Sequence, residues 1–181
     1  MSDQASKIIL LCEDESQERL TREYLKKCGA KNVERILRAE VAGGFTRVLD
    51  QFPRELRACR SRHAKTLLVV LIDADQLSVE QRHSQLNERA KAAELAEVAS
   101  DEPVVIFIPK RNIETWLEAL LGNQVNEEDV CKKRKKLTKD NFRQAARTLF
   151  DWSRPNAKPG PTIVDSLKKS LPGWKKVSDS L

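Results

Sequence analysis

Acidic side chains follow two apolar runs of the chain, at the points where buried strands would end. Glu13 comes directly after the run Lys7–Cys12. Asp73 and Asp75 follow the run Thr66–Ile72 as D-A-D. Carboxylates held close together repel one another unless a cation lies between them, and the hard ions Mg²⁺ and Mn²⁺ prefer carboxylate oxygens. These acids therefore predict a divalent metal site if the fold brings the two runs together.

A third apolar run, Pro103–Ile108, is followed by residues of mixed charge. Lys110 and Arg111 come where the chain leaves this run, and Glu114 lies one helical turn into the next segment. If the three runs are parallel strands of one sheet, all of these residues reach the same edge, outside the carboxyl ends of the strands. That edge would then hold several carboxylates and two cations in one crevice.

Apolar runs alternate with amphipathic segments along most of the chain. Continuous apolar runs too short for helices indicate buried strands, which we expect at Lys7–Cys12, Asn32–Arg38, Thr66–Ile72 and Pro103–Ile108. Helices are expected at Gln17–Cys28 with Ser16 as N-cap, Phe45–Phe52, Arg54–Arg60 after a break at Pro53, Val79–Ala99, Ile113–Leu121, Cys131–Trp152 and Ile163–Leu171. The alternation predicts an α/β protein with a Rossmann-like sheet of about four mainly parallel strands and helices on both faces.

Positive charge is concentrated in the last third of the chain. Residues 122–181 hold 14 Lys and Arg against 7 Asp and Glu, whereas residues 1–121 hold 19 against 20. The sequence therefore predicts an α/β core over 1–121 and a basic helical extension over 122–181 that packs on the core. The densest basic run, which could follow a nucleic-acid backbone, is Lys132, Lys133, Arg134, Lys135 and Lys136. A solvated basic surface is the alternative.

Other features exclude whole classes of protein. No apolar run approaches the roughly 20 residues of a membrane span, and the first residues lack the apolar segment of a secretory signal. We therefore expect a cytoplasmic protein without a membrane partner. The four cysteines are scattered and there are only two histidines, which favours free thiols and leaves oxygen ligands for any metal. The sequence contains no P-loop, so ATP hydrolysis by the chain itself is not expected.

The acidic motifs resemble those of the Toprim family, whose domain occurs in topoisomerases, primases, small ribonucleases and nucleases of the overcoming-lysogenisation-defect kind. The family pattern is a glutamate that closes the first strand and a D-x-D that closes the third. Here these are Glu13 in L-L-C-E-D-E-S and Asp73 with Asp75 in L-I-D-A-D. Ile108–Leu117 (I-P-K-R-N-I-E-T-W-L) and Ser166–Trp174 (S-L-K-K-S-L-P-G-W) are similar to segments of small Toprim-like proteins of bacterial defence loci.

Two positions depart from the family pattern. Asp14 stands where a glycine usually follows the glutamate, and Gln76 and Leu77 follow the D-x-D in place of a glycine or a further acid. The motif therefore does not supply a third metal-binding acid. Glu114 is the candidate for that role, either as ligand to a second metal or as a residue that orients Arg111.

The resemblance implies a metal-dependent nuclease that cleaves DNA or RNA with Mg²⁺ or Mn²⁺ as cofactor. Asp73 and Asp75 would bind the metal, and Glu13 would act as general acid/base or complete the metal shell. Lys110 or Arg111 would steady the phosphate as charge develops. Because small Toprim-like proteins are often encoded beside an ATPase, the resemblance also implies an antiviral defence effector that works with a partner ATPase.

Two other functions are compatible with the same residues. Receiver domains of response regulators also place an acidic pair after the first strand, which Glu13 and Asp14 would supply. Asp73 would then accept a phosphoryl group, and Lys110 would be the lysine that follows a late strand. The long gap between Asp14 and Asp73 argues against this alternative. A non-catalytic subunit that binds nucleic acid or a partner protein is the other.

Overall fold

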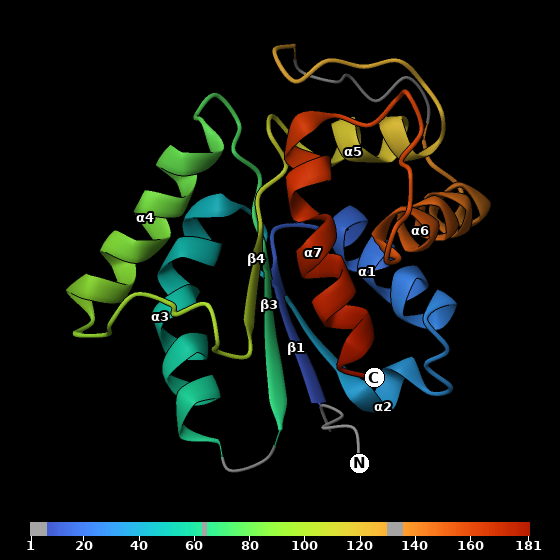
Figure 1. The fold of residues 1–181 in the computed structure, drawn as a ribbon. Helices are drawn as coiled ribbons and strands as arrows, with labels where there is room; N and C mark the ends of the chain where they lie inside the picture. The colour runs from blue at the N-terminus through green and yellow to red at the C-terminus, as the bar shows by residue number, and fades with distance from the viewer. Residues whose placement is uncertain (1–6, 63–64, 130–135) are drawn as a thin grey trace.

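Four parallel strands form one sheet at the centre of the molecule (Figure 1). The structure is a computed structural model and describes residues 7–62, 65–129 and 136–181. The strands, in the order β2-β1-β3-β4 across the sheet, are β1 (Lys7–Cys12), β2 (Leu37–Val41), β3 (Thr66–Leu71) and β4 (Val104–Phe107). The predicted α/β class and the parallel Rossmann-like sheet are therefore confirmed.

Helices cover both faces of the sheet (Figure 1). On one face lie α3 (Phe45–Ser61) and α4 (Val79–Ala92). On the other lie α1 (Glu15–Lys27), α5 (Ile113–Leu120), α6 (Lys139–Ser153) and α7 (Asp165–Asp179). The short α2 (Val33–Ile36) precedes β2. Each face has its own hydrophobic core because side chains alternate along a strand. In β1, Leu10 belongs to the core beneath α1, and Leu11 belongs to the core beneath α3.

The expected strand at Asn32–Arg38 is wrong in its first half. The Asn32 side chain accepts a hydrogen bond from the backbone N–H of Arg35 and thereby caps the single turn of α2. Asparagine commonly bonds to nearby backbone in this way and so competes with strand pairing. The strand β2 begins only at Leu37 and continues to Val41.

The expected break at Pro53 does not occur, and α3 is continuous through it. Proline in a helix removes one hydrogen bond and crowds the preceding turn. The apolar stripe of α3 is buried on the sheet and includes Val48, Leu49, Phe52, Leu56 and Cys59. This burial outweighs the local penalty, because most helix stability in proteins comes from packing.

Several helix ends differ from the expected ones. Asp14, not Ser16, is the N-cap of α1, because its carboxylate accepts the N–H groups of Ser16 and Gln17. The helix α4 stops at Ala92, seven residues short of the expected end. Thr138 caps α6, so residues 136–138 are not helical, and the rest of the expected early start lies outside the described residues. The helix α7 continues past Leu171 and through Pro172.

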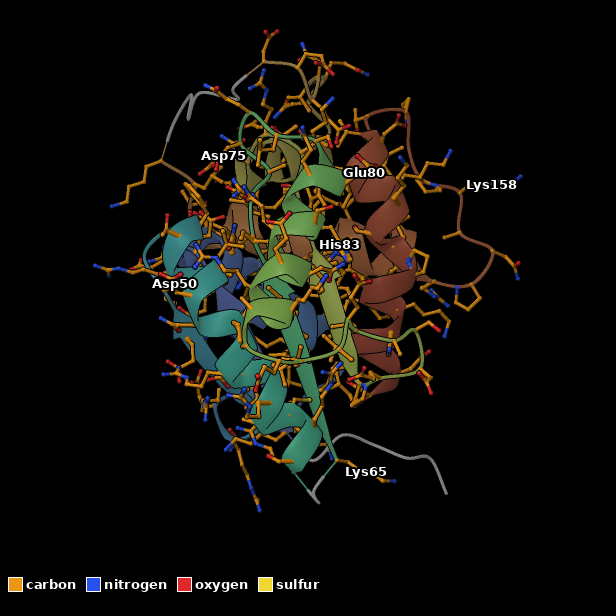
Figure 2. The ribbon with its side chains drawn as sticks, turned by 90° about the vertical axis from the view of Figure 1, so that its left-hand side faces the viewer. Asp50, Lys65, Asp75, Glu80, His83 and Lys158 are labelled. Carbon is orange, nitrogen blue, oxygen red and sulfur yellow. The ribbon has the colours of Figure 1, made fainter. Side chains whose placement is uncertain are left out.

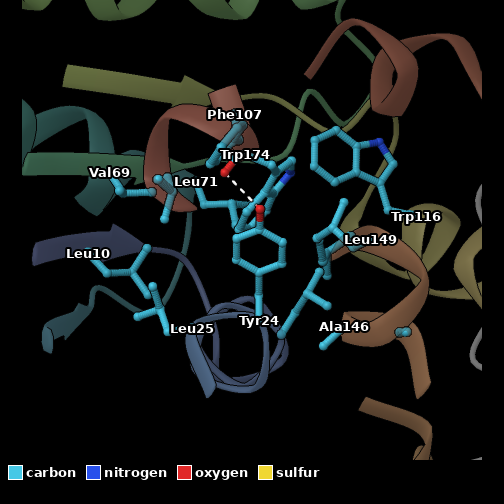
Figure 3. Packing of buried hydrophobic residues seen from close by; sticks show 14 of the residues in the cluster. Leu10, Tyr24, Leu25, Val69, Leu71, Phe107, Trp116, Ala146, Leu149 and Trp174 are labelled. Carbon is cyan, nitrogen blue, oxygen red and sulfur yellow. Dashed lines mark hydrogen bonds between the residues drawn. The ribbon is translucent and has the colours of Figure 1, made fainter. Parts of the chain in front are cut away.

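The last helix, α7, packs directly on β4. A Cβ atom on Gly173 would lie only 2.7 Å from Cε1 of Phe107 and 2.9 Å from Cγ1 of Val105, so glycine allows this close approach. The next residue, Trp174, stacks on the Phe107 ring with centroids 4.2 Å apart. Its carbonyl accepts a 2.8 Å hydrogen bond from the hydroxyl of Tyr24 in α1 (Figure 3). The helix α7 thus completes the core on this face.

The thiols and the helices agree with two further expectations. Cys12, Cys28 and Cys59 are free thiols, and Cys131 lies outside the described residues. In the part of the chain that the structure describes, no helix is both long and apolar enough to cross a membrane.

Candidate active site

The carboxyl ends of β1 and β3 form the point where the sheet reverses its winding. The two strands are neighbours, yet the chain leaves β1 into α1 on one face and leaves β3 into α4 on the other (Figure 1). In open α/β sheets a crevice opens at such a switch point and ligands bind there. Glu13 and Asp73 are placed at this point, one residue after β1 and two residues after β3.

Glu13 and Asp73 are joined by a short network of hydrogen bonds. The backbone N–H of Asp73 donates to Oε1 of Glu13 over 2.6 Å. The buried side chain of Gln17 bridges the pair, since its Nε2 donates to Oδ1 of Asp73 over 2.9 Å and its Oε1 accepts from the backbone N–H of Glu13 over 2.8 Å. The first turn of α1 thus holds the two acids in a fixed relation.

Both acids of the pair hold protons more tightly than usual. Burial raises the pKa of Glu13 to about 7, against the lowering effect of the hydrogen bond from the Asp73 N–H. Burial also raises the pKa of Asp73 to about 9, and the like charge of Glu13 adds to the rise. Glu114, buried in the first turn of α5, makes a smaller contribution of the same sign to Asp73. A cation placed among these acids would relieve this repulsion.

Asp75 is held by Arg82 from α4. The guanidinium of Arg82, only 2% exposed, donates to Oδ2 of Asp75 over 2.9 Å and to the carbonyl of Asp73 over 2.8 Å. Its remaining partners include Gln85, whose Oε1 accepts over 2.8 Å. The planar, five-donor guanidinium can bind several acceptors at once. Arg82 therefore braces both ends of the D-A-D segment.

The backbones of Asp75 and Arg111 face each other in a strained arrangement. The two residues form an isolated antiparallel bridge, in which the N–H of Asp75 donates to the carbonyl of Arg111 over 2.9 Å. Both have positive φ, 54° and 67°. This left-handed conformation costs a residue other than glycine roughly 1–2 kcal/mol. Such strain concentrates at functional sites, where it fixes the direction of side chains.

A cavity of about 660 Å³ opens beside these residues. It is lined by Glu13, Gly44, Phe45, Asp75, Gln76, Leu77, Arg82, Gln85, Arg111 and Asn112. Of the two expected phosphate-binding cations, the structure brings Arg111 to this cavity. Lys110 instead forms a 2.5 Å ion pair with Glu128, and its backbone N–H donates to the hydroxyl of Ser166.

Only part of the expected nucleic-acid-binding run can be placed. Lys132, Lys133, Arg134 and Lys135 lie outside the described residues. The exposed Lys136 lines a second cavity, of about 350 Å³, together with Asp14 and Ser16 at the start of α1. This end of the run is therefore next to the Glu13 segment.

A second group of basic residues, between Arg54 and Lys65, does not face the acids. Lys65 precedes β3 and Asp75 follows it, so the two lie at opposite ends of the sheet (Figure 2). Arg60, near the end of α3, forms a two-point ion pair with Glu102 over 2.7 Å. Arg60 thus joins α3 to the loop that precedes β4.

The donor set fits a divalent ion that is held partly by the substrate. Within residues 7–62, 65–129 and 136–181, no three His, Cys, Asp or Glu side chains are close enough together to hold a metal by themselves. Mg²⁺ in phosphate-processing sites usually takes one or two carboxylates and completes its shell with water and phosphate oxygens. Glu13 and Asp73, neighbours through the hydrogen bond from the Asp73 N–H to Glu13 Oε1, would supply two such carboxylates, whereas the carboxylate of Asp75 is engaged by Arg82.

Three residues of the site were not predicted. Gln17 shares the buried face of α1 with Leu20 and Tyr24, and Arg82 shares the buried face of α4 with Leu86. Large polar side chains are almost never buried without partners, so a glutamine and an arginine on apolar helix faces were usable signals. Phe45 gave no comparable signal, because a single aromatic residue at a helix start is unremarkable.

The segments Ile108–Leu117 and Ser166–Trp174 contact each other. Trp116 in α5 donates from Nε1 to the hydroxyl of Ser166 over 2.7 Å, and Ser166 donates in turn to the carboxylate of Glu127. These residues join α5, the loop that follows it and the start of α7. Comparison with family models, curated proteins and solved structures finds no match to the chain.

Proposed function

We propose that the chain is a Toprim-type nuclease that uses Mg²⁺ or Mn²⁺ to cleave phosphodiester bonds in DNA or RNA. The observation that carries the proposal is the pair Glu13 and Asp73, held together at the switch point of the sheet with both pKa values raised. Such crowding of acids is unfavourable for stability and is typical of sites that bind a cation or transfer a proton.

The residues take distinct roles in this proposal. Asp73 would hold the metal together with the substrate phosphate, Glu13 would complete the metal shell or act as general acid/base, and Asp75 remains the partner that fixes Arg82. Lewis-acid stabilisation of the charge on the phosphate is the chemistry that a bound metal would supply. Glu13, with its Oε1 occupied by the Asp73 N–H, has Oε2 to hold or move a proton. Arg111, at the cavity, steadies the phosphate.

The test is cleavage of single- and double-stranded DNA and RNA in Mg²⁺, Mn²⁺ or EDTA. We expect Asp73→Asn and Glu13→Gln each to lower cleavage at least about 100-fold, as expected for loss of a group that acts on the transition state. Glu15→Gln is the matched control, because Glu15 is close in sequence but exposed and paired with Arg19. Equal cleavage by wild type and both site variants would refute the proposal.

The receiver alternative is less well supported by the contacts. Its phospho-acceptor would be Asp73, which is only 7% exposed and bonded to Gln17. Its lysine would be Lys110, whose ammonium pairs with Glu128. Transfer of a phosphoryl group from acetyl phosphate to the carboxylate of Asp73 would support this alternative.

The role as a defence effector with a partner ATPase rests on the sequence resemblance. If the isolated chain does not cleave nucleic acid, calorimetric titration with Mn²⁺ in the presence of an oligonucleotide still tests the site, because binding of the metal by Asp73, Glu13 and a substrate phosphate requires no turnover. We expect binding by wild type and not by Asp73→Asn. Addition of the ATPase encoded nearby would then be expected to start cleavage.

A further inference from the structure

We propose that the cavity beside Glu13 binds an unpaired nucleotide of single-stranded nucleic acid, with its base stacked on Phe45 and its phosphate held by Arg111. This inference rests on the proposed function, since it takes the ligand of the site to be nucleic acid. It adds that the substrate is single-stranded at the point of contact.

Phe45 is the first observation. Among the described residues, only Val41 and Phe45 are large apolar side chains left exposed, at 42% and 40%. Both flank the loop whose Gly43 N–H donates to the carbonyl of Glu13 over 2.8 Å. A single exposed apolar side chain is common on protein surfaces, but an aromatic ring that lines a cavity can contact a bound ligand. Phe45 lines the 660 Å³ cavity, which is within the range of small-molecule sites.

The ring is already fixed on one side. The Arg82 guanidinium lies 4.3 Å from the Phe45 ring centroid, and Arg82 is in turn bonded to the D-A-D segment. A base stacked on the exposed part of the ring would form a three-layer stack of base, phenyl ring and guanidinium. Stacking and cation–π attraction both favour this arrangement. The same arginine would tie the position of the base to the position of Asp73.

The cavity also offers groups for the rest of a nucleotide. Arg111 carries positive charge, and Gly44, the N-cap of α3, lines the same cavity. The amide of Gln76 can bond to base edges, which carry both donors and acceptors. An apolar platform with adjacent cations is typical of single-strand binding.

Base pairing explains why a duplex does not fit. Bases within a duplex are stacked on both sides, so a lone aromatic ring can stack only on a base that has left its helix. A duplex must first lose pairing and stacking at that base, which reduces its affinity. The cavity should therefore discriminate between single and double strands.

The test is binding measured in EDTA, so that cleavage and metal play no part. Fluorescence anisotropy is recorded with labelled oligothymidylate, oligouridylate and a blunt-ended duplex of two separate strands, which has no loop. Wild type should bind both single strands more tightly than the duplex. Phe45→Ala and Phe45→Leu should each weaken single-strand binding about tenfold, as expected for loss of one stacked base, while Phe45→Trp should preserve it. Val41→Ala is the matched control and should bind like wild type.

Three results would overturn the inference. Phe45→Leu could bind single strands as tightly as wild type, or wild type could bind the duplex as tightly as the single strands. The third is that substitution of Phe45 weakens duplex binding as much as it weakens single-strand binding. Thermal unfolding of each variant separates loss of stacking from loss of fold, and Phe45→Trp retains an aromatic ring if the smaller variants unfold. Failure of the proposed function would be visible elsewhere, as metal-dependent cleavage that does not change in Asp73→Asn. The two failures are therefore distinguishable.

Discussion

The backbone N–H of Asp73 donates to Oε1 of Glu13 over 2.6 Å, across 60 positions of sequence. This bond joins the ends of two neighbouring parallel strands, β1 and β3. It requires the carboxylate of Glu13 to point along the sheet edge toward the D-A-D segment and not into solvent. The distance between the two acids is therefore fixed by sheet pairing and does not depend on a flexible loop.

Asp73→Asn should stabilise the protein while it removes the proposed metal site. The amide oxygen can still accept from Gln17, and the substitution removes the free-energy cost of protonating Asp73 when the chain folds at pH 7, a cost that follows from its raised pKa. We expect the free energy of unfolding to rise by about 1 kcal/mol at pH 7, the size of gain typical when a strained functional site is relieved. Urea unfolding measures this change. A drop in stability would mean that Asp73 is a structural acid.

Asp75→Asn should have the opposite effect on stability. It removes the carboxylate partner of the buried Arg82 and leaves part of that charge without compensation. Because the Asp75 side chain is half exposed, solvent limits the loss to about 1 kcal/mol. The same urea titration measures it. If Asp73→Asn raises the free energy of unfolding and Asp75→Asn lowers it, the two acids of the D-A-D motif have different roles. Changes of the same sign and size would contradict the assigned roles.

Arg82→Lys should not substitute for Arg82. An ammonium cannot reach the Asp73 carbonyl, the Asp75 carboxylate and Gln85 at once, as the guanidinium does. We expect the turnover number for cleavage to fall at least about tenfold, since a small displacement of the reacting groups has that effect. KM should change less. The check is steady-state kinetics together with thermal unfolding. If Arg82→Lys retains full turnover, Arg82 supports only the fold.

Gly173→Ala tests the close packing of α7 on β4. The added Cβ would lie 2.7 Å from the Phe107 ring and 2.9 Å from Val105, both of them buried core residues. Overpacking of this kind costs about 1–3 kcal/mol, and chemical denaturation should show that loss. Lys169→Ala, on the exposed side of the same helix, is the control and should change stability by less than about 0.5 kcal/mol.

Stability should fall in acid through Glu102. Its two hydrogen bonds from Arg60 lower the pKa of Glu102 from 4.5 to about 2. A carboxyl group with a lowered folded-state pKa adds stability that is complete above its unfolded value. That stability is lost as the pH falls from about 4.5 toward 2. Because the pair is partly exposed, we expect about 1 kcal/mol. The difference in unfolding free energy between wild type and Glu102→Gln should therefore shrink over this range, and a constant difference would contradict the prediction.

The sheet was predictable because three of its strands are continuous apolar runs. Covered on both faces, β1, β3 and β4 are apolar at nearly every position, and their observed ends lie within one residue of the predicted ones. The edge strand β2 has only one buried residue, Leu37, so its pattern was weak and its start was misplaced. The predicted helix break at Pro53 was wrong for a related reason. The packing that keeps α3 continuous involves residues distant in sequence.

The candidate site was predictable in its acids and not in their partners. Glu13 and Asp73 follow strands whose ends must meet once the sheet is parallel, so local sequence and topology suffice. Gln17 and Arg82 act only because α1 and α4 turn particular faces toward the strand ends. Lys110 and Arg111 are adjacent and chemically alike, and only the bridge at Asp75 determines which of them reaches the cavity.

The packing of Trp174 on Phe107 has a consequence during translation. The apolar surface of β4 stays uncovered until α7 packs on it, and Trp174 of α7 comes nearly seventy positions after Phe107. Until that helix leaves the ribosome, the nascent chain presents this surface uncovered, together with the hydroxyl of Tyr24 that it will later bond. The earlier helices can form beforehand, but the core on the α1 face is complete only after α7 has packed on β4. A cellular chaperone could bind the exposed apolar surface during that interval.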